Sequence, residues 1–88
     1  MYIFKPASRF KRQYKKLSQN DKQIAKMLID KLLNDEVLDP KHKDHKLTGQ
    51  YDGFRECHIK PDLLLIYKKE KRILILICLA IGSHSELF

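Results

Sequence analysis

The sequence predicts an α+β fold in which an N-terminal strand and a two-helix hairpin pack on a twisted, mostly antiparallel sheet. Apolar residues recur at helical spacing in the first third of the chain, and apolar strand-like runs joined by short turns fill the last third. Helices that precede a series of strands are typical of α+β proteins, whereas alternating elements would predict an α/β fold. A chain of 88 residues is expected to form one domain, spanning residues 1–88.

The first elements follow from apolar spacing and its interruptions. A short apolar run broken by Pro6 predicts a brief first strand. Phe10, Tyr14 and Leu17 recur at i, i+4 and i+7, which is the spacing of one helical face. A second apolar face predicts a longer helix over about residues 21–34. The two helices are expected to form an antiparallel hairpin.

The second half of the chain predicts a loop followed by three strands. Residues 35–49 are polar, which indicates a loop. Strands are expected over residues 54–59, 62–67 and 72–81, with Pro61 ending the first of them. The last strand is apolar in both phases of its alternation. It is therefore expected at the centre of the sheet, with both faces covered.

Net charge is the strongest compositional signal. Lys and Arg number 18 against 11 Asp and Glu, which gives a net charge of +7, and residues 1–50 hold most of the excess. Such a surplus favours a polyanionic partner such as RNA, with a merely basic surface as the alternative. The longest apolar run, Ile73–Ile81, is too short to span a bilayer, and the first residues lack the apolar core of a secretory signal. A cytoplasmic protein with no membrane contact is expected.

The two cysteines predict neither a metal site nor a disulfide framework. Cys57 and Cys78 lie in separate apolar runs, without the spacing of a ligand pair. They are expected to be small, reduced residues of the core. No metal or other cofactor is expected.

Three polar clusters interrupt the apolar runs of the second half. They are Asp44-His45, Glu56-Cys57-His58 with Asp62, and Gly82-Ser83-His84. Imidazoles and carboxylates are the side chains that transfer protons near neutral pH. On a cationic protein they indicate metal-free cleavage of RNA. Glu56 lies two residues before His58, on the same face of the predicted strand, where it can orient the imidazole.

The candidate site residues divide by their chemistry. His45, His58 and Asp62 are candidates for the base that takes the 2′-OH proton, and His84 is the candidate acid that protonates the leaving 5′-oxygen. Phe88 is a candidate for stacking on a base. The candidate phosphate-binding side chains are Lys41, Lys43, Lys46 and Arg55. Structural alternatives stay open: a surface ion pair for His58, a turn or cap for Asp62, and packing of the chain end for Phe88.

Three ordered motifs resemble the YafQ-type branch of the RelE/ParE toxin superfamily. They are Lys43-Asp44-His45-Lys46-Leu47-Thr48-Gly49, the segment from Gly53 to Tyr67 that contains Glu56-Cys57-His58 and Asp62, and Gly82-Ser83-His84-Ser85-Glu86-Leu87-Phe88. The resemblance implies a microbial ribonuclease-like α+β fold and endoribonucleolytic cleavage of mRNA, in many relatives on the translating ribosome. It also implies a cognate antitoxin as partner, with operator DNA contacted only through that antitoxin. The residues that fall on functional positions of the family are His45, His58, Asp62, His84 and Phe88.

Two positions depart from the family pattern. Leu63 stands where a Trp can follow the Asp in this branch, so stacking from that position is lost. Ala80 stands two residues before Gly82, where relatives often carry Arg, a residue suited to holding the scissile phosphate. Either cleavage is weakened, or Arg55, Arg72 or a lysine supplies the charge.

These departures keep a second class of function open, a toxin-like module that binds antitoxin or nucleic acid without cutting. A third possibility is the gyrase-poisoning ParE side of the superfamily. The combination of histidines and carboxylates favours the enzyme, because a protein that only binds has no need of it. The same combination argues against the gyrase-poisoning side.

Overall fold

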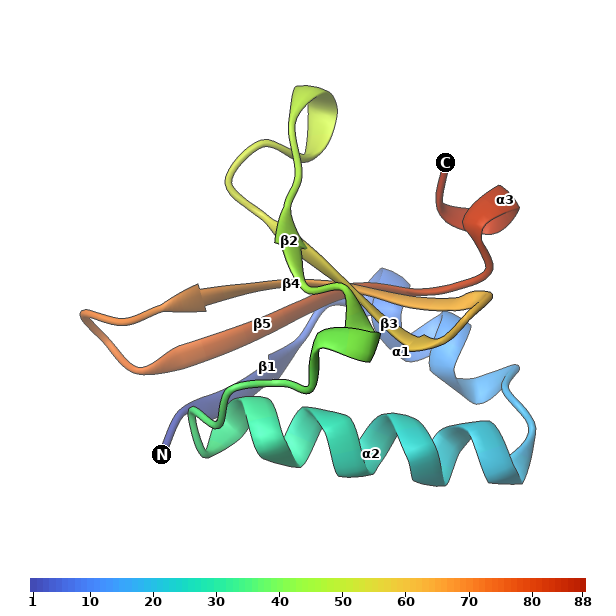
Figure 1. Cartoon of the computed structure of the whole chain (residues 1–88), viewed down its shortest axis with the longest axis horizontal. Helices are drawn as coiled ribbons and strands as arrows, with labels where there is room; N and C mark the ends of the chain where they lie inside the picture. The colour runs from blue at the N-terminus through green and yellow to red at the C-terminus, as the bar shows by residue number, and fades with distance from the viewer.

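Five strands form one sheet in the computed structural model, which describes residues 1–88 (Figure 1). In chain order the elements are β1 (Ile3–Pro6), α1 (Ser8–Lys15), α2 (Gln19–Leu33), the 3-10 turn η1 (Pro40–His42), β2 (His45–Lys46), the 3-10 turn η2 (Gly49–Tyr51), β3 (Arg55–Lys60), β4 (Leu63–Glu70), β5 (Ile75–Gly82) and α3 (His84–Leu87). The strand order is β1-β5-β4-β3-β2. Only β1 and β5 pair in parallel. The predicted α+β class and mostly antiparallel sheet are confirmed.

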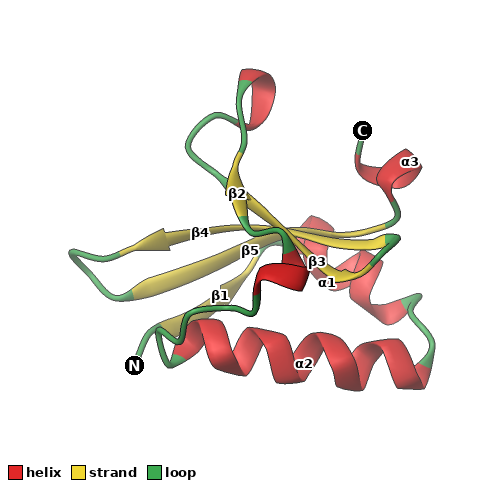
Figure 2. Ribbon diagram, viewed as in Figure 1, coloured by secondary structure: helices red, strands yellow, loops and turns green.

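The two N-terminal helices cover one face of the sheet, with the longer α2 running beneath it (Figure 2). α2 begins at Gln19, two residues before its predicted start, because Ser18 is its N-cap. The Asp21 N–H donates a hydrogen bond to Ser18 Oγ at 3.1 Å. The buried face of α2 follows the helical period and consists of Ala25, Leu28, Ile29 and Leu32.

The β4–β5 hairpin differs from the prediction in the position of its turn and in how far β5 is covered. β5 begins at Ile75, three residues later than predicted, because residues 71–74 form the turn, with Leu74 at a φ of 53°. β4 is the middle strand of the sheet, and its first five residues are all buried. Alternate residues at the start of β5 are only half-buried. β5 is an interior strand between β1 and β4, as predicted, but the prediction that both of its faces are covered is wrong for its first half.

Buried residues form two groups on opposite faces of the sheet. The helix-facing group, called the first core, includes Cys57, Leu65, Tyr67 and Cys78 from the strands. The second core faces away from α1 and α2 and consists of Tyr51, Leu64, Ile66, Ala80 and Leu87. Alternation along β4 explains the division, because successive side chains of a strand point to opposite faces.

Both cysteines are fully buried in the first core, and they form no disulfide. Burial raises the pKa of the Cys78 thiol to about 12 and raises the pKa of the Cys57 thiol as well. The prediction that Cys57 and Cys78 are core residues is confirmed.

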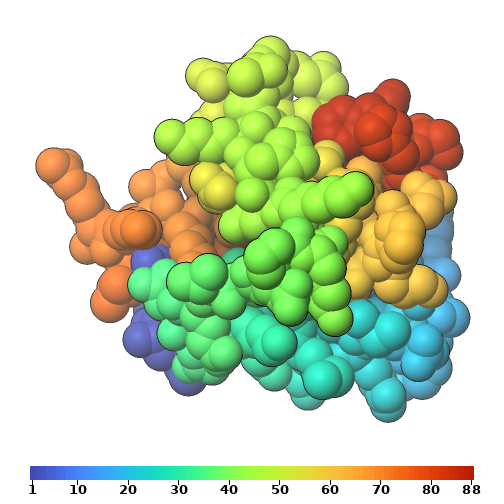
Figure 3. Space-filling model, in the orientation of Figure 1, coloured from blue at the N-terminus to red at the C-terminus, as the bar shows by residue number.

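The C-terminal segment packs over the second core. In Figure 3 this segment (red) lies against the segment around residues 45–55 (yellow-green). The contact includes the rings of Tyr51 and Phe88, whose centres are 5.5 Å apart. No helix has the length and apolar character needed to cross a membrane.

Candidate active site

The strand register brings several candidate residues to the second-core face of the sheet. His45 on β2 pairs with Glu56 on β3. The row continues from Glu56 to Ile66 on β4, and from there to Ala80 on β5. Directly opposed residues of antiparallel strands place their side chains on the same face. Because Ile66 and Ala80 belong to the second core, His45 and Glu56 lie on that face too.

A neighbouring row carries His58 and leads towards His84. His58 pairs with Leu64, and Leu64 pairs with Gly82. Adjacent strands lie about 4.8 Å apart, so the Cα atoms of His58 and Gly82 are separated by roughly 10 Å. His84 follows Gly82 by two residues, at the start of α3. The two imidazoles therefore belong to neighbouring parts of one face, although they are distant in the sequence.

Glu56 is a buried carboxylate shared by two imidazoles. Only 5% of its surface is exposed, and its Oε1 atom lies 3.6 Å from His45 Nε2 and 3.5 Å from His58 Nε2. The Nδ1–H of His45 donates a hydrogen bond to the Lys43 carbonyl oxygen at 2.6 Å. Because a carbonyl only accepts, Nδ1 carries a hydrogen, and Nε2 is the nitrogen that gains or loses the proton. The carboxylate is thus buried, whereas the side chain of His58 is 22% exposed and that of His45 is 50% exposed.

His42 is a site residue that the sequence reasoning missed. Its Nδ1–H donates a hydrogen bond to the His58 carbonyl oxygen at 2.7 Å, which holds η1 against β3. His42 and His58 line one pocket together with Lys41, Lys43 and Lys60. Two of the predicted phosphate-binding lysines thus lie beside His58. The signal was present as the run Lys41-His42-Lys43, in which an imidazole is flanked by two cations.

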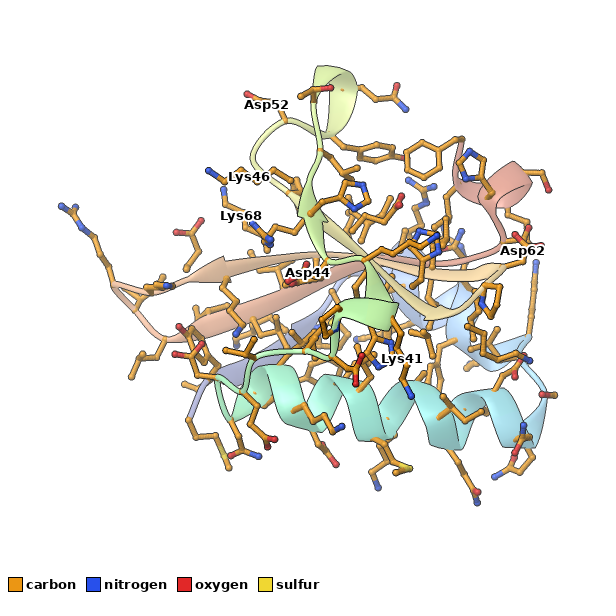
Figure 4. The ribbon with its side chains drawn as sticks, viewed as in Figure 1. Lys41, Asp44, Lys46, Asp52, Asp62 and Lys68 are labelled. Carbon is orange, nitrogen blue, oxygen red and sulfur yellow. The ribbon has the colours of Figure 1, made fainter.

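Lys46 and Arg55 line a different pocket, together with Lys68 and Tyr67. Arg55 Nε is 3.2 Å from Asp44 Oδ1, which also accepts a 2.6 Å hydrogen bond from the Tyr67 hydroxyl. Burial, and then the hydrogen bond to Asp44, raise the pKa of Tyr67, so its hydroxyl stays a protonated donor. Figure 4 shows Lys46 and Lys68 close together and well away from Asp62, which lies near α3. The predicted basic residues therefore line two pockets, and Lys43 borders both of them.

A capping box holds the short helix α3. Ser83 Oγ accepts a hydrogen bond from the Glu86 N–H at 3.3 Å, and the Ser83 N–H donates to Glu86 Oε1 at 2.7 Å. A Cβ at Gly82 would lie 3.0 Å from that same Oε1, so Gly82 leaves room for the returning carboxylate. Asp62 Oδ1 accepts the His84 N–H at 3.1 Å, which adds a second anchor at the start of α3. The helix-capping alternative considered for Asp62 is thus supported.

His84, Phe88 and Tyr51 form a row of rings at the end of the chain. The centres of the His84 and Phe88 rings are 5.1 Å apart, and those of Phe88 and Tyr51 are 5.5 Å apart with the planes at 83°. The Tyr51 hydroxyl donates a hydrogen bond to the Leu87 carbonyl oxygen at 3.1 Å. Phe88 remains 51% exposed. An aromatic surface is therefore open to a stacking partner beside His84.

Ala80 is fully buried in the second core and offers no hydrogen-bond donor from its side chain. Of the substitutes considered from the sequence, Arg55 pairs with Asp44. Arg72 lies in the turn before β5, whose eight residues separate it from α3 by about 25 Å of strand. Figure 1 shows that turn at the opposite end of the sheet from α3. Neither arginine lies beside His84.

Replacing Glu86 tests the capping box. Glu86→Ala should speed amide exchange at Leu87 and Phe88 several-fold near neutral pH, because the Ser83 N–H loses its acceptor. Glu86→Gln is the matched control and should protect both amides, since Gln also closes such a box. Equal exchange in the alanine variant and in the wild type would contradict a role for the box.

The same interaction predicts a loss of order in acid. The hydrogen bond from the Ser83 N–H lowers the pKa of Glu86. A carboxyl with a lower pKa in the folded state stabilises that state above its unfolded pKa, about 4.3, and the gain is lost as the pH falls through the folded value. Amide exchange in wild-type α3 should therefore rise to that of Glu86→Gln below about pH 4, because the protonated carboxyl is a neutral acceptor like the amide.

No group of three or more His, Cys, Asp or Glu side chains is arranged to hold a metal ion. What the arrangement can do chemically is transfer protons. Glu56 orients two imidazoles, and a third imidazole stands on α3 beside an exposed aromatic ring. Lysines close to His58 supply positive charge for an anionic substrate.

Solved structures with the same fold include bacterial toxins. The metal-bound toxin from Helicobacter pylori has a TM-score of 0.90 and 40% sequence identity, with 100% of both chains covered. A chain of the Escherichia coli DinJ-YafQ toxin-antitoxin complex has a TM-score of 0.85 and 29% identity, covering 99% of this chain and 97% of that chain.

The sequence comparisons identify the family. The family described as the bacterial toxin of type II toxin-antitoxin system, YafQ, matches residues 2–88. The mRNA interferase toxin YafQ of Escherichia coli strain K12 is 36% identical over 69 residues, which are 77% of this chain and 73% of that relative. The protein therefore belongs to the YafQ family of bacterial type II toxins, and the resemblance carried by the three sequence motifs is confirmed.

Proposed function

We propose that this YafQ-family toxin is an endoribonuclease that cleaves mRNA by metal-free attack of a 2′-OH on the adjacent phosphate. The observation that carries the proposal is the position of His58 and His84 on one face of the sheet, with a buried carboxylate and a lysine-lined pocket beside His58. The Escherichia coli relative bears the name mRNA interferase toxin. The alternative of a module that binds without cutting rests on Leu63 and Ala80 alone.

In the proposed reaction a base accepts the 2′-OH proton and the 2′-oxygen attacks the phosphorus in line. The bond from phosphorus to the 5′-oxygen breaks, and the imidazolium form of His84 gives that oxygen a proton. The products are one RNA ending in a 2′,3′-cyclic phosphate and one beginning with a 5′-OH. Lys41 and Lys43 offset the charge that develops on the phosphate. Phe88 stacks on a neighbouring base.

Geometry favours His58 as the base among the three candidates. His58 lies two strands from Gly82, whereas His45 on β2 lies one strand further away. Asp62 already accepts the His84 N–H, which supports a role in positioning His84. The buried carboxylate of Glu56 faces the Nε2 atoms of His58 and His45 and orients both imidazoles. We propose that Lys46 and Arg55, in the other pocket, contact RNA away from the cut.

A cognate antitoxin is the proposed protein partner. The support is structural similarity to a chain of the Escherichia coli DinJ-YafQ toxin-antitoxin complex. A positively charged site favours a partner that brings negative charge to it. Operator DNA would be contacted only through the antitoxin, and mRNA would be met in the cytoplasm, on the ribosome or free.

Cleavage of a labelled mRNA tests the proposed function. The purified protein, assayed with and without programmed ribosomes, should cut the mRNA in at least one of the two conditions. Where cutting occurs without ribosomes, it should persist in excess chelator. The upstream product should end in a 2′,3′-cyclic phosphate or, after its hydrolysis, a 3′-phosphate. A requirement for added divalent metal would contradict the metal-free chemistry. No cutting in any lane would contradict the proposed endoribonuclease activity.

A further inference from the structure

Arg9 reaches the C-terminal side of the site and has no carboxylate partner. Its Nη1–H donates a hydrogen bond to the Tyr51 hydroxyl at 2.9 Å, and its guanidinium carbon lies 5.8 Å from the centre of the Tyr51 ring. None of the ion pairs in the protein includes Arg9. Arginine carries five N–H donors, and only one of them is used here. The guanidinium therefore keeps its charge and most of its donors for a ligand.

The short first strand explains how Arg9 reaches this face. β1 pairs with β5 no further than Cys78, so no strand covers the last part of that edge. α1 covers it instead, and Gln13 Oε1 accepts the Ile81 N–H at 3.0 Å. From the first turn of the same helix, Arg9 extends to Tyr51 in the second core.

Tyr51 connects Arg9 to the proposed acid. The ring of Tyr51 contacts that of Phe88, and the ring of Phe88 contacts that of His84, with centres 5.5 Å and 5.1 Å apart. The other arginines considered for this role lie elsewhere, and Ala80 supplies no donor. Arg9 is thus an unpaired cation anchored next to the aromatic row that ends in His84.

We propose that Arg9 binds the scissile phosphate and stabilises the charge that develops on it. This inference rests on the proposed ribonuclease function. A planar guanidinium can donate two parallel hydrogen bonds to a phosphate, which a lysine cannot do. A preorganised donor at the reacting phosphate typically contributes about 10²–10³ in rate.

Substitutions on α1 provide matched variants for the test. Arg9→Gln should lower kcat/KM for RNA cleavage by about 10²–10³-fold, and Arg9→Lys should recover only part of the loss. Arg12→Gln removes the same charge from an exposed position on the same helix and should stay within about twofold of the wild type. Tyr51→Phe removes the anchoring hydroxyl but leaves the guanidinium, so its loss should be smaller than that of Arg9→Gln. Equal losses in Arg9→Gln and Tyr51→Phe would show that Arg9 acts only by holding Tyr51 in place and does not bind the phosphate.

Binding gives a readout that does not depend on cleavage. The probe is a single-stranded 2′-O-methyl RNA of mixed sequence, which lacks the attacking hydroxyl. Arg9→Gln should weaken its binding and reduce the slope of log K against log salt by about 0.7, the value for one phosphate contact on a single strand. Arg12→Gln should leave the slope unchanged, and identical slopes in Arg9→Gln and the wild type would overturn the assignment. If the wild type binds this probe but cuts no RNA, the proposed function fails while the slopes still decide the phosphate contact of Arg9.

Discussion

Replacing His84 by alanine should lower the rate of RNA cleavage by about 10²–10⁴-fold, the contribution typical of one general acid. Without the imidazolium, the 5′-oxygen has to leave without a proton. The position of the residue fits this role, because its backbone N–H is held by Asp62 at 3.1 Å and its ring lies 5.1 Å from the centre of the Phe88 ring. Single-turnover cleavage of a labelled mRNA measures the effect without interference from product release.

Two controls separate proton donation by His84 from a structural role. His84→Gln keeps a polar side chain that cannot supply a proton, so it should be as impaired as His84→Ala. A substrate with sulfur in place of the 5′-oxygen has a leaving group that needs no proton, and on it His84→Ala should cut almost as fast as the wild type. An undiminished defect on the sulfur substrate would contradict the assignment of His84 as the acid. The Ser83–Glu86 box does not use the imidazole, so α3 should keep its order in both variants.

The long elements could be predicted because each repeats an apolar period many times. The apolar face of α2 and the runs in β3, β4 and β5 carry such repeats, and their existence and order are confirmed. β2 has only two residues, too few to show a period, and it exists because its backbone pairs with β3. The sequence predicts the start of β5 three residues too early, because Ile73 and Leu74 are apolar but lie in the turn, where they are exposed.

The candidate site was predictable in residue type but not in grouping. The motifs contain His45, Glu56 and His58, and alternation alone places the last two on one face. The meeting of His45 with Glu56 depends on the register of β2, which no local signal specifies. The placement of Lys41 and Arg55 in different pockets and the hydrogen bond from Arg9 to Tyr51 also depend on contacts between residues distant in the sequence. Such contacts depend on side-chain length and on which strand edge stays uncovered.

The second large effect concerns the base. His58→Ala should lower cleavage by about 10²–10⁴-fold, comparable with His84→Ala, because each residue handles one of the two protons. Asp62→Asn should retain most of the activity. The asparagine keeps an oxygen that can accept the His84 N–H, as Asp62 Oδ1 does at 3.1 Å, but it cannot take a proton from a 2′-OH.

The comparison of Asp62→Asn with Asp62→Ala assigns the role of this carboxylate, because only the alanine variant releases the start of α3. If Asp62 positions His84, alanine should impair cleavage and speed exchange of the His84 amide, while asparagine changes neither much. If Asp62 is the base, both variants should lose activity equally and His58→Ala should be the milder change. The strand register favours Asp62 as the residue that positions His84, because His58 lies in the row that ends at Gly82 and is therefore the better candidate base. The buried Glu56 Oε1 also lies 3.5 Å from His58 Nε2 and orients that imidazole. The proposed base and acid would then approach one phosphate from two elements, β3 and α3, that the sheet holds at a fixed separation.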